Sequence, residues 1–154
     1  MNEVFIIIGL ILLNGVFAMS EVALISARKS RLSADAKNGN KSAKTALKLA
    51  NEPDRFLSTV QIGITLIGIL TGIYSGNQIA VDLTETMKIW GVSSFYAFGL
   101  AQGIIVVVVT YLTIIFGELV PKRIGMSMAE KAAKVMARPM NVLSVIALPF
   151  VRLL

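Results

Sequence analysis

The chain has 154 residues, of which 55% are apolar and 16% are charged, with a mean hydropathy of +0.75 and a net charge of +6. This composition excludes an ordinary soluble domain and indicates an integral membrane protein, and the basic residues flank apolar stretches without the interleaved aromatics of a nucleic-acid surface, so no nucleic-acid partner is expected. The absence of cysteine and histidine excludes disulfides, thiolate or imidazole metal sites and Cys or His nucleophiles, so any metal ion must be bound by oxygen atoms.

Three apolar stretches are long enough to cross a bilayer core of about 30 Å, which takes roughly 20 helical residues. They comprise residues 4–26, 56–79 and 95–116. The intervening segment 28–54, together with Arg55 directly after it, carries eight basic and three acidic residues, and the positive-inside rule places it in the cytoplasm. The connection 80–94 has a single basic residue and is expected outside. We therefore expect a multi-pass protein of the cell (inner) membrane, with its N-terminus outside and its basic loops in the cytoplasm.

Within 28–54, the triplet Asn38-Gly39-Asn40 interrupts an alternation of small apolar and basic residues. Asn and Gly together are strong turn formers, so the segment is predicted to form a cytoplasmic hairpin of two short helices.

The last segment, 124–154, is predicted to be a juxtamembrane helix. Residues 126–136 are amphipathic and suit the inner membrane surface, and Pro139 is expected to bend the chain after them. Residues 140–154 are apolar but interrupted by a proline and an arginine, which favours a juxtamembrane or re-entrant element over a fourth span. Because the chain ends inside an apolar stretch, it is expected to be a fragment that continues into a cytoplasmic domain.

Glu118 follows the third apolar stretch directly. A carboxylate near the hydrocarbon core is costly and usually faces a cavity, a cation or an ion path. Pro121 lacks the amide that would bond to the carbonyl of Gly117, so the segment is expected to offer a carboxylate and an unsatisfied backbone oxygen, which are ligand types that magnesium prefers. The alternatives are an ion pair between Glu118 and Lys122 and a simple helix stop.

Counting along the helices places Ser20, Glu21 and Ser58 at the depth of Glu118, near the cytoplasmic ends of the spans. An ion pair with Arg28 is an equal alternative for Glu21. The usual fate of a serine in a membrane helix is to donate to the carbonyl four residues back. Four further polar residues in the spans are better explained as interhelical hydrogen-bonding groups than as ligands: Asn14, Gln61, Thr65 and Gln102. A stripe of three glycines on the second span is explained equally well by packing within one subunit and by a dimer seam or sliding surface: Gly68, Gly72 and Gly76.

Three motifs together resemble the transmembrane domain of the CorC/CNNM family of magnesium transporters. They are NGVFAMSEVAL at 14–24, RFLSTVQIG at 55–63 and FGELVPK at 116–122. The resemblance covers the whole chain, so 1–154 is expected to be one all-α membrane domain with three transmembrane helices, a cytoplasmic hairpin and a juxtamembrane belt helix. It implies a homodimer, and in full-length relatives cytoplasmic CBS nucleotide-binding domains and a small acidic domain follow.

The resemblance also implies a magnesium ion in an inward-facing cavity, with export driven by exchange for sodium in several members. Carried over by motif, Glu118 and the Gly117 carbonyl would be ligands, and Ser20 and Ser58 would add hydroxyl oxygens. Many relatives have an asparagine where this chain has Ile64, so that amide is missing here. On the second helix, Thr65, Gln61 or water would have to compensate.

The expected function is thus magnesium transport through a site between the spans. The alternative is a membrane anchor or magnesium sensor that transports nothing and serves cytoplasmic regulatory domains. An enzyme is not expected, because the sequence contains no credible nucleophile and base pair, no phosphate-binding glycine loop and no cofactor fingerprint.

Overall fold

The structure is a computed structural model that describes residues 2–76 and 78–153, and within these ranges it is helical with no strand. Its elements are α1 (Asn2–Ser26), α2 (Lys29–Lys37), α3 (Lys41–Asn51), α4 (Pro53–Gly76), α5 (Gln78–Ile89), α6 (Ser94–Ile114), the π-helical turn η1 (Ile115–Leu119), α7 (Val120–Ser127) and α8 (Ala129–Leu153). The predicted all-α class is confirmed.

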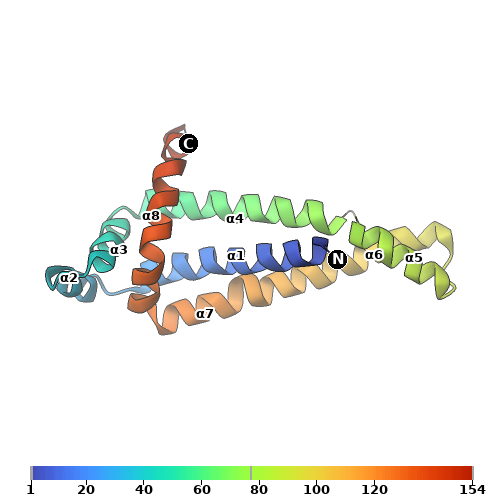
Figure 1. Cartoon of the computed structure of the whole chain (residues 1–154), viewed down its shortest axis with the longest axis horizontal. Coiled ribbons are helices and arrows are strands. Elements are labelled where there is room, and N and C mark those ends of the chain that lie inside the picture. The colour runs from blue at the N-terminus through green and yellow to red at the C-terminus, as the bar shows by residue number, and fades with distance from the viewer. Residues whose placement is uncertain (1, 77, 154) are drawn as a thin grey trace.

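The long helices form a bundle with α1 in the middle. α1 packs against α4 on one side and against η1 and α7 on the other. These long helices run side by side (Figure 1). Side chains such as Phe17, Leu24, Phe56 and Val60 are buried between them, while many large apolar side chains remain exposed on the outside. An apolar exterior around a packed bundle is the surface that a lipid bilayer requires.

Among the residues that the structure describes, four helical stretches are long and apolar enough to cross a membrane, one more than the sequence predicts. They are Asn2–Ser26, Pro53–Ile89, Ser94–Ser127 and Ala129–Leu153. The fourth is α8, which crosses the ends of the other helices instead of running alongside them (Figure 1).

The bend predicted after Pro139 stays a prediction, but the helix is not interrupted there. Pro139 and Pro149 both lie inside one continuous helix, α8. A proline costs a helix one hydrogen bond, and burial on both sides of Pro139 offsets that loss, since Ala137, Met140 and Ser144 all pack into the interior.

The predicted hairpin is present as α2 and α3. Gly39 turns the chain with φ +93°, a conformation that glycine adopts without strain. The Asn40 side chain caps α3 by accepting a bond from the Ala43 amide at 3.0 Å. The connection 80–94 is largely helical: α5 packs against the start of α6 and buries Ala80, Thr84 and Met87.

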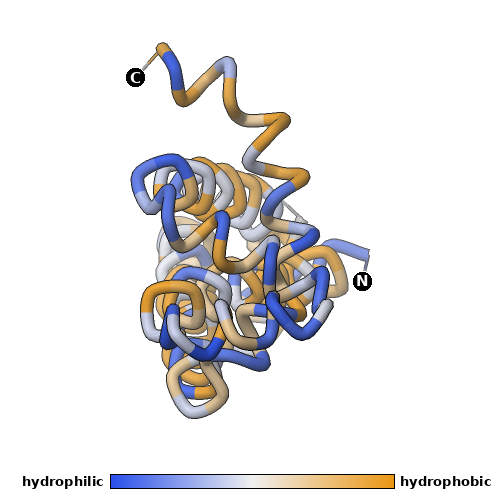
Figure 2. Tube along the Cα trace, turned by 90° about the vertical axis from the view of Figure 1, so that its left-hand side faces the viewer, coloured by the Kyte–Doolittle hydropathy of each residue, from blue (hydrophilic) through white to orange (hydrophobic). Residues whose placement is uncertain are grey.

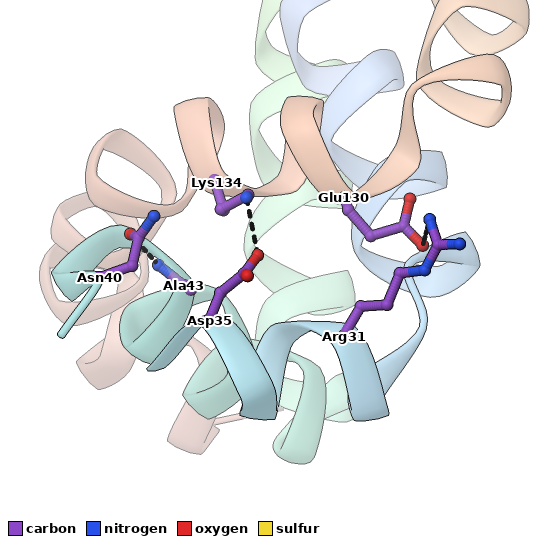
Figure 3. Close-up of polar contacts among 6 residues, drawn as sticks. All are labelled: Arg31, Asp35, Asn40, Ala43, Glu130 and Lys134. Carbon is purple, nitrogen blue, oxygen red and sulfur yellow. Dashed lines mark hydrogen bonds and ion pairs between the residues drawn. The ribbon is translucent and has the colours of Figure 1, made fainter. Parts of the chain in front are cut away.

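Two ion pairs join the hairpin to α8. Lys134 Nζ donates to Asp35 Oδ2 at 2.8 Å, and Arg31 approaches Glu130 at 4.0 Å (Figure 3). The pKa of Glu130 is lowered by its own backbone amide and, against the opposing effect of burial, by the Arg28 amide and the Arg31 guanidinium. Glu130 therefore carries its charge in these contacts at neutral pH.

Candidate functional site

A cavity of about 380 Å³ lies between α1, α4 and the third helical stretch. The half-buried Glu118 lines it from η1, and no ion pair joins Glu118 to a basic residue among those the structure describes. The remaining polar lining comes from all three helices: Asn14 of α1, Thr71 and Ser75 of α4, and Thr110 and Thr113 of α6. The alternative ion pair with Lys122 is thus not formed, and Glu118 lines a cavity instead.

Three of the hydroxyl groups around this cavity donate their proton to a backbone carbonyl, so toward the cavity they can only accept hydrogen bonds. Thr71 donates to the Ile67 carbonyl at 2.8 Å, and Thr113 donates to the Val109 carbonyl at 2.7 Å. Ser75 likewise donates to Gly72 at 3.2 Å. A hydroxyl that has given its proton to the backbone retains only lone pairs for the cavity. Together with the Glu118 carboxylate, these oxygens make a lining that suits a cation or a hydrogen-bond donor.

The carbonyl of Gly117 has a partner from another helix. Asn14 Nδ2 donates to it at 2.9 Å in a buried contact, supplying a donor where Pro121 has none to offer. The expectation of an unsatisfied carbonyl is therefore wrong, whereas the prediction that Asn14 forms an interhelical hydrogen bond is confirmed. The amide oxygen of Asn14 takes no part in this bond.

Pro121 does not end the third helix. The Val120 amide bonds to the Ile115 carbonyl, five residues back, and this π-helical turn leads the chain past the proline into α7. The helical stretch therefore continues to Ser127, beyond the predicted end at residue 116. Turns of this kind occur frequently at functional sites.

The predicted common depth of the site residues is wrong. Because Gly117 contacts Asn14, twelve residues from either end of α1, Glu118 lies near the middle of the bundle. Ser20 lies six residues further toward the hairpin, a distance of about 9 Å along a helix. The prediction failed because Glu118 was taken to close the third helix, which instead continues to Ser127.

The other predicted ligands lie apart from this cavity. Glu21 and Ser58 line a second, open hollow between α1 and α4, toward the hairpin. Ser20 is fully buried and donates to the Val16 carbonyl at 2.7 Å, the usual fate of a membrane serine. Thr65 is exposed and accepts a 3.5 Å bond from Gln61. The ligand assignments of all four residues stay predictions.

Four hydroxyl residues of the cavity were not predicted from the sequence: Thr71, Ser75, Thr110 and Thr113. The signal that could have found two of them is helical spacing, since Thr71 and Ser75 follow Gly68 and Gly72 at regular intervals of three and four residues. Gly68, Gly72 and Gly76 have open space where a side chain would begin, and the first two line the cavity. Packing within this chain is therefore not the reason for the glycine stripe.

The cavity contains a single carboxylate among the residues described, and no group of three or more acidic side chains able to hold a metal ion occurs in that part of the chain. The site is thus weakly charged and rich in neutral oxygens. Such a lining suits a cation that keeps part of its water shell better than one stripped of all its water.

The sequence matches a known protein family. Residues 5–154 match the model described as the cyclin M transmembrane N-terminal domain, CNNM. The chain is 48% identical to UPF0053 protein sll0260 of Synechocystis sp. over 152 residues, which is 99% of this chain and 34% of that protein. It is 32% identical over 154 residues to UPF0053 protein YhdT of Bacillus subtilis, covering 97% and 32%. It is 30% identical over 151 residues to a polyamine export protein of Escherichia coli K12, covering 98% and 34%. The chain spans about a third of the length of these relatives.

Proposed function

The chain belongs to the family of cyclin M transmembrane N-terminal domains, and from this premise we propose that it is the membrane domain of a transporter that carries magnesium through the cavity beside Glu118. Export, and exchange for sodium, belong to the same proposal and rest on the family resemblance. The single observation that supports it is the lining of the cavity, where one carboxylate and several hydroxyl oxygens from different helices converge.

The size of the cavity suits this cargo. A water molecule occupies roughly 30 Å³ in the liquid, so the six waters of a hydrated magnesium ion take roughly 180 Å³, and the cavity has about 380 Å³. Magnesium loses its water reluctantly and is usually held by one or two carboxylates with several waters retained. Glu118 supplies the charge, and the Thr71, Ser75 and Thr113 oxygens can accept hydrogen bonds from the retained waters.

The experiment is magnesium flux in vesicles that contain the full-length protein and a trapped magnesium indicator. Glu118→Gln keeps the size of the side chain and removes its charge, and the matched control is Glu85→Gln, an exposed carboxylate on α5 outside the cavity. We expect Glu118→Gln to lower flux by on the order of 10- to 100-fold, the loss produced even by groups that only orient metal ligands.

The control variant should transport like the unmodified protein. Equal flux from the Glu118→Gln variant would contradict the proposal. Magnesium binding by the unmodified protein without any flux would instead favour the anchor or sensor.

A polyamine is the second candidate cargo. Relatives from Escherichia coli and Salmonella typhimurium are named polyamine export proteins, and the cavity combines acceptor oxygens with apolar side chains such as Ile67 and Val106. Ammonium groups could donate to the oxygens while methylene groups contact the apolar wall. Putrescine flux in the same vesicles separates the two, because transport of putrescine without magnesium would replace the first candidate by the second.

A further inference from the structure

The surface of α8 is divided into three stripes along its length. One stripe is buried against the rest of the protein: Ala129, Ala133, Ala137, Met140 and Ser144. A second stripe is exposed and basic, with members seven and fourteen residues apart on one face: Lys131, Arg138 and Arg152. A third stripe is exposed and apolar: Val135, Val142, Ile146, Phe150 and Leu153. Val135 and Val142 follow Lys131 and Arg138 by four residues each, and such a step advances only a little around a helix. The basic and apolar stripes therefore lie next to each other.

The basic stripe is not neutralised by the protein. Lys131, Arg138 and Arg152 form no ion pair with a carboxylate anywhere in residues 2–76 and 78–153. The acidic residue of α8, Glu130, is directed to Arg31 of the hairpin (Figure 3). Arg138 and Arg152 thus remain on the exposed side of α8 without a carboxylate partner, and Lys131 forms no ion pair although it lines a hollow with Asp35 and Glu130.

The position of α8 matches a membrane surface. It crosses the ends of the long helices where the hairpin joins them (Figure 1). Its C-terminal half projects past the bundle with hydrophilic and hydrophobic residues alternating along the chain (Figure 2). A helix placed across the ends of membrane-spanning helices lies parallel to the bilayer plane, at the level of the lipid headgroups.

From these observations we propose that α8 is a docking surface for anionic phospholipids, whose headgroups bind Lys131, Arg138 and Arg152 while the apolar stripe enters the adjoining acyl layer. The bilayer explains both exposed stripes at once, since it offers negative charge and hydrocarbon side by side. A second copy of the chain fits less well, because a symmetric contact through this face would bring the two basic stripes together. The proposal does not depend on which ion the protein transports.

The test uses the purified full-length protein in a neutral detergent. Phosphatidylglycerol or phosphatidylcholine is titrated in, and lipid binding is followed through the rise in melting temperature. The test variant is Lys131→Gln/Arg138→Gln/Arg152→Gln. The matched control is Lys41→Gln/Lys44→Gln/Lys48→Gln, which removes the same charge from exposed positions of α3.

We expect the unmodified protein and the control variant to prefer phosphatidylglycerol, and the test variant to lose that preference. Each basic residue near an anionic surface contributes roughly fivefold, so the triple change should weaken binding by on the order of 100-fold. In the unmodified protein the preference should also fall when the salt is raised to about 1 M, where the Debye length shrinks to about 3 Å. This second measurement needs no variant and remains informative if the triple variant folds poorly.

Three results would overturn the proposal. One is equal stabilisation by both lipids, and another is an equal loss in the control variant, which would indicate a general attraction between opposite charges. The third concerns the apolar stripe: if Val142→Ser/Ile146→Ser/Phe150→Ser separates an oligomer while the lipid preference persists, this face is a contact between subunits.

Discussion

The hydrogen bond between Asn14 and Gly117 links two features that are separate in the sequence. Pro121 has no amide to donate to the Gly117 carbonyl, and Asn14 of another helix donates to it at 2.9 Å. The sequence predicted both a carbonyl deprived of its donor and an interhelical role for Asn14. It could not show that the two belong to one bond, because the residues are 103 positions apart and their pairing depends on how far α1 slides along the third helix.

Replacement of Asn14 by leucine tests this bond, because leucine has nearly the same shape and no donor. The Gly117 carbonyl would lose a buried partner, which costs about 1–3 kcal/mol. We expect the free energy of unfolding in detergent to fall by that amount, and magnesium flux to fall too because Glu118 adjoins the carbonyl. Gln102→Leu, an exposed position of α6, is the control and should change stability by less than about 0.5 kcal/mol. Similar losses from both variants would show that the bond contributes nothing specific.

At the scale of elements, α1 and the third helical stretch approach closely because glycines lie between them. A methyl group added at Gly15 would lie 2.9 Å from Pro121 Cγ and 3.0 Å from the Phe116 carbonyl oxygen. One added at Gly125 would lie 2.8 Å from the carbonyl oxygen of Met19. The small residues thus set the distance between the helices, as they commonly do in membrane proteins, and they bring Asn14 within reach of η1.

Two substitutions on α1 separate this packing effect from helix propensity. Gly15→Ala places a methyl group against backbone and proline atoms that cannot move aside easily, and we expect a loss of about 1–3 kcal/mol in stability. Gly9→Ala adds the same group to the same helix where nothing lies within 4 Å, and its better helix propensity should stabilise by up to about 1 kcal/mol. Chemical unfolding in mixed micelles measures both, and equal effects at the two positions would refute the close approach.

The sequence specified some elements better than others. The apolar stretches and the hairpin around Gly39 were predicted because hydrophobicity and turn chemistry are local properties. The helix α5 was missed because its short amphipathic pattern, with Ala80, Thr84 and Met87 on one face, is weak beside the long apolar runs. The site was predicted only at Glu118, since its hydroxyl lining depends on the rotation of α4 and α6 about their own axes, which residue counting does not give.

At the scale of the whole molecule, the interpretation of α8 decides the topology. α8 has the length and apolarity of a membrane span, yet it crosses the bundle, and its exposed side carries Lys131, Arg138 and Arg152. A charged residue at the centre of a span costs about 2.5–3.5 kcal/mol on insertion scales, and Arg138 lies near the middle of α8. We therefore propose three spans with α8 along the inner surface, the arrangement expected from the sequence.

Single cysteines test this topology, because these 154 residues contain none of their own. We propose Lys37→Cys in the hairpin, Ile89→Cys at the end of α5 and Leu153→Cys at the end of α8, all at exposed positions. In intact cells a membrane-impermeant maleimide should label only residue 89, and after permeabilisation it should label all three. Labelling of residue 153 together with residue 89 in intact cells would mean that α8 crosses the membrane, because its two ends would then lie on opposite sides. That result would contradict both the three-span topology and the lipid-docking surface. It would not affect the proposal for the cavity beside Glu118.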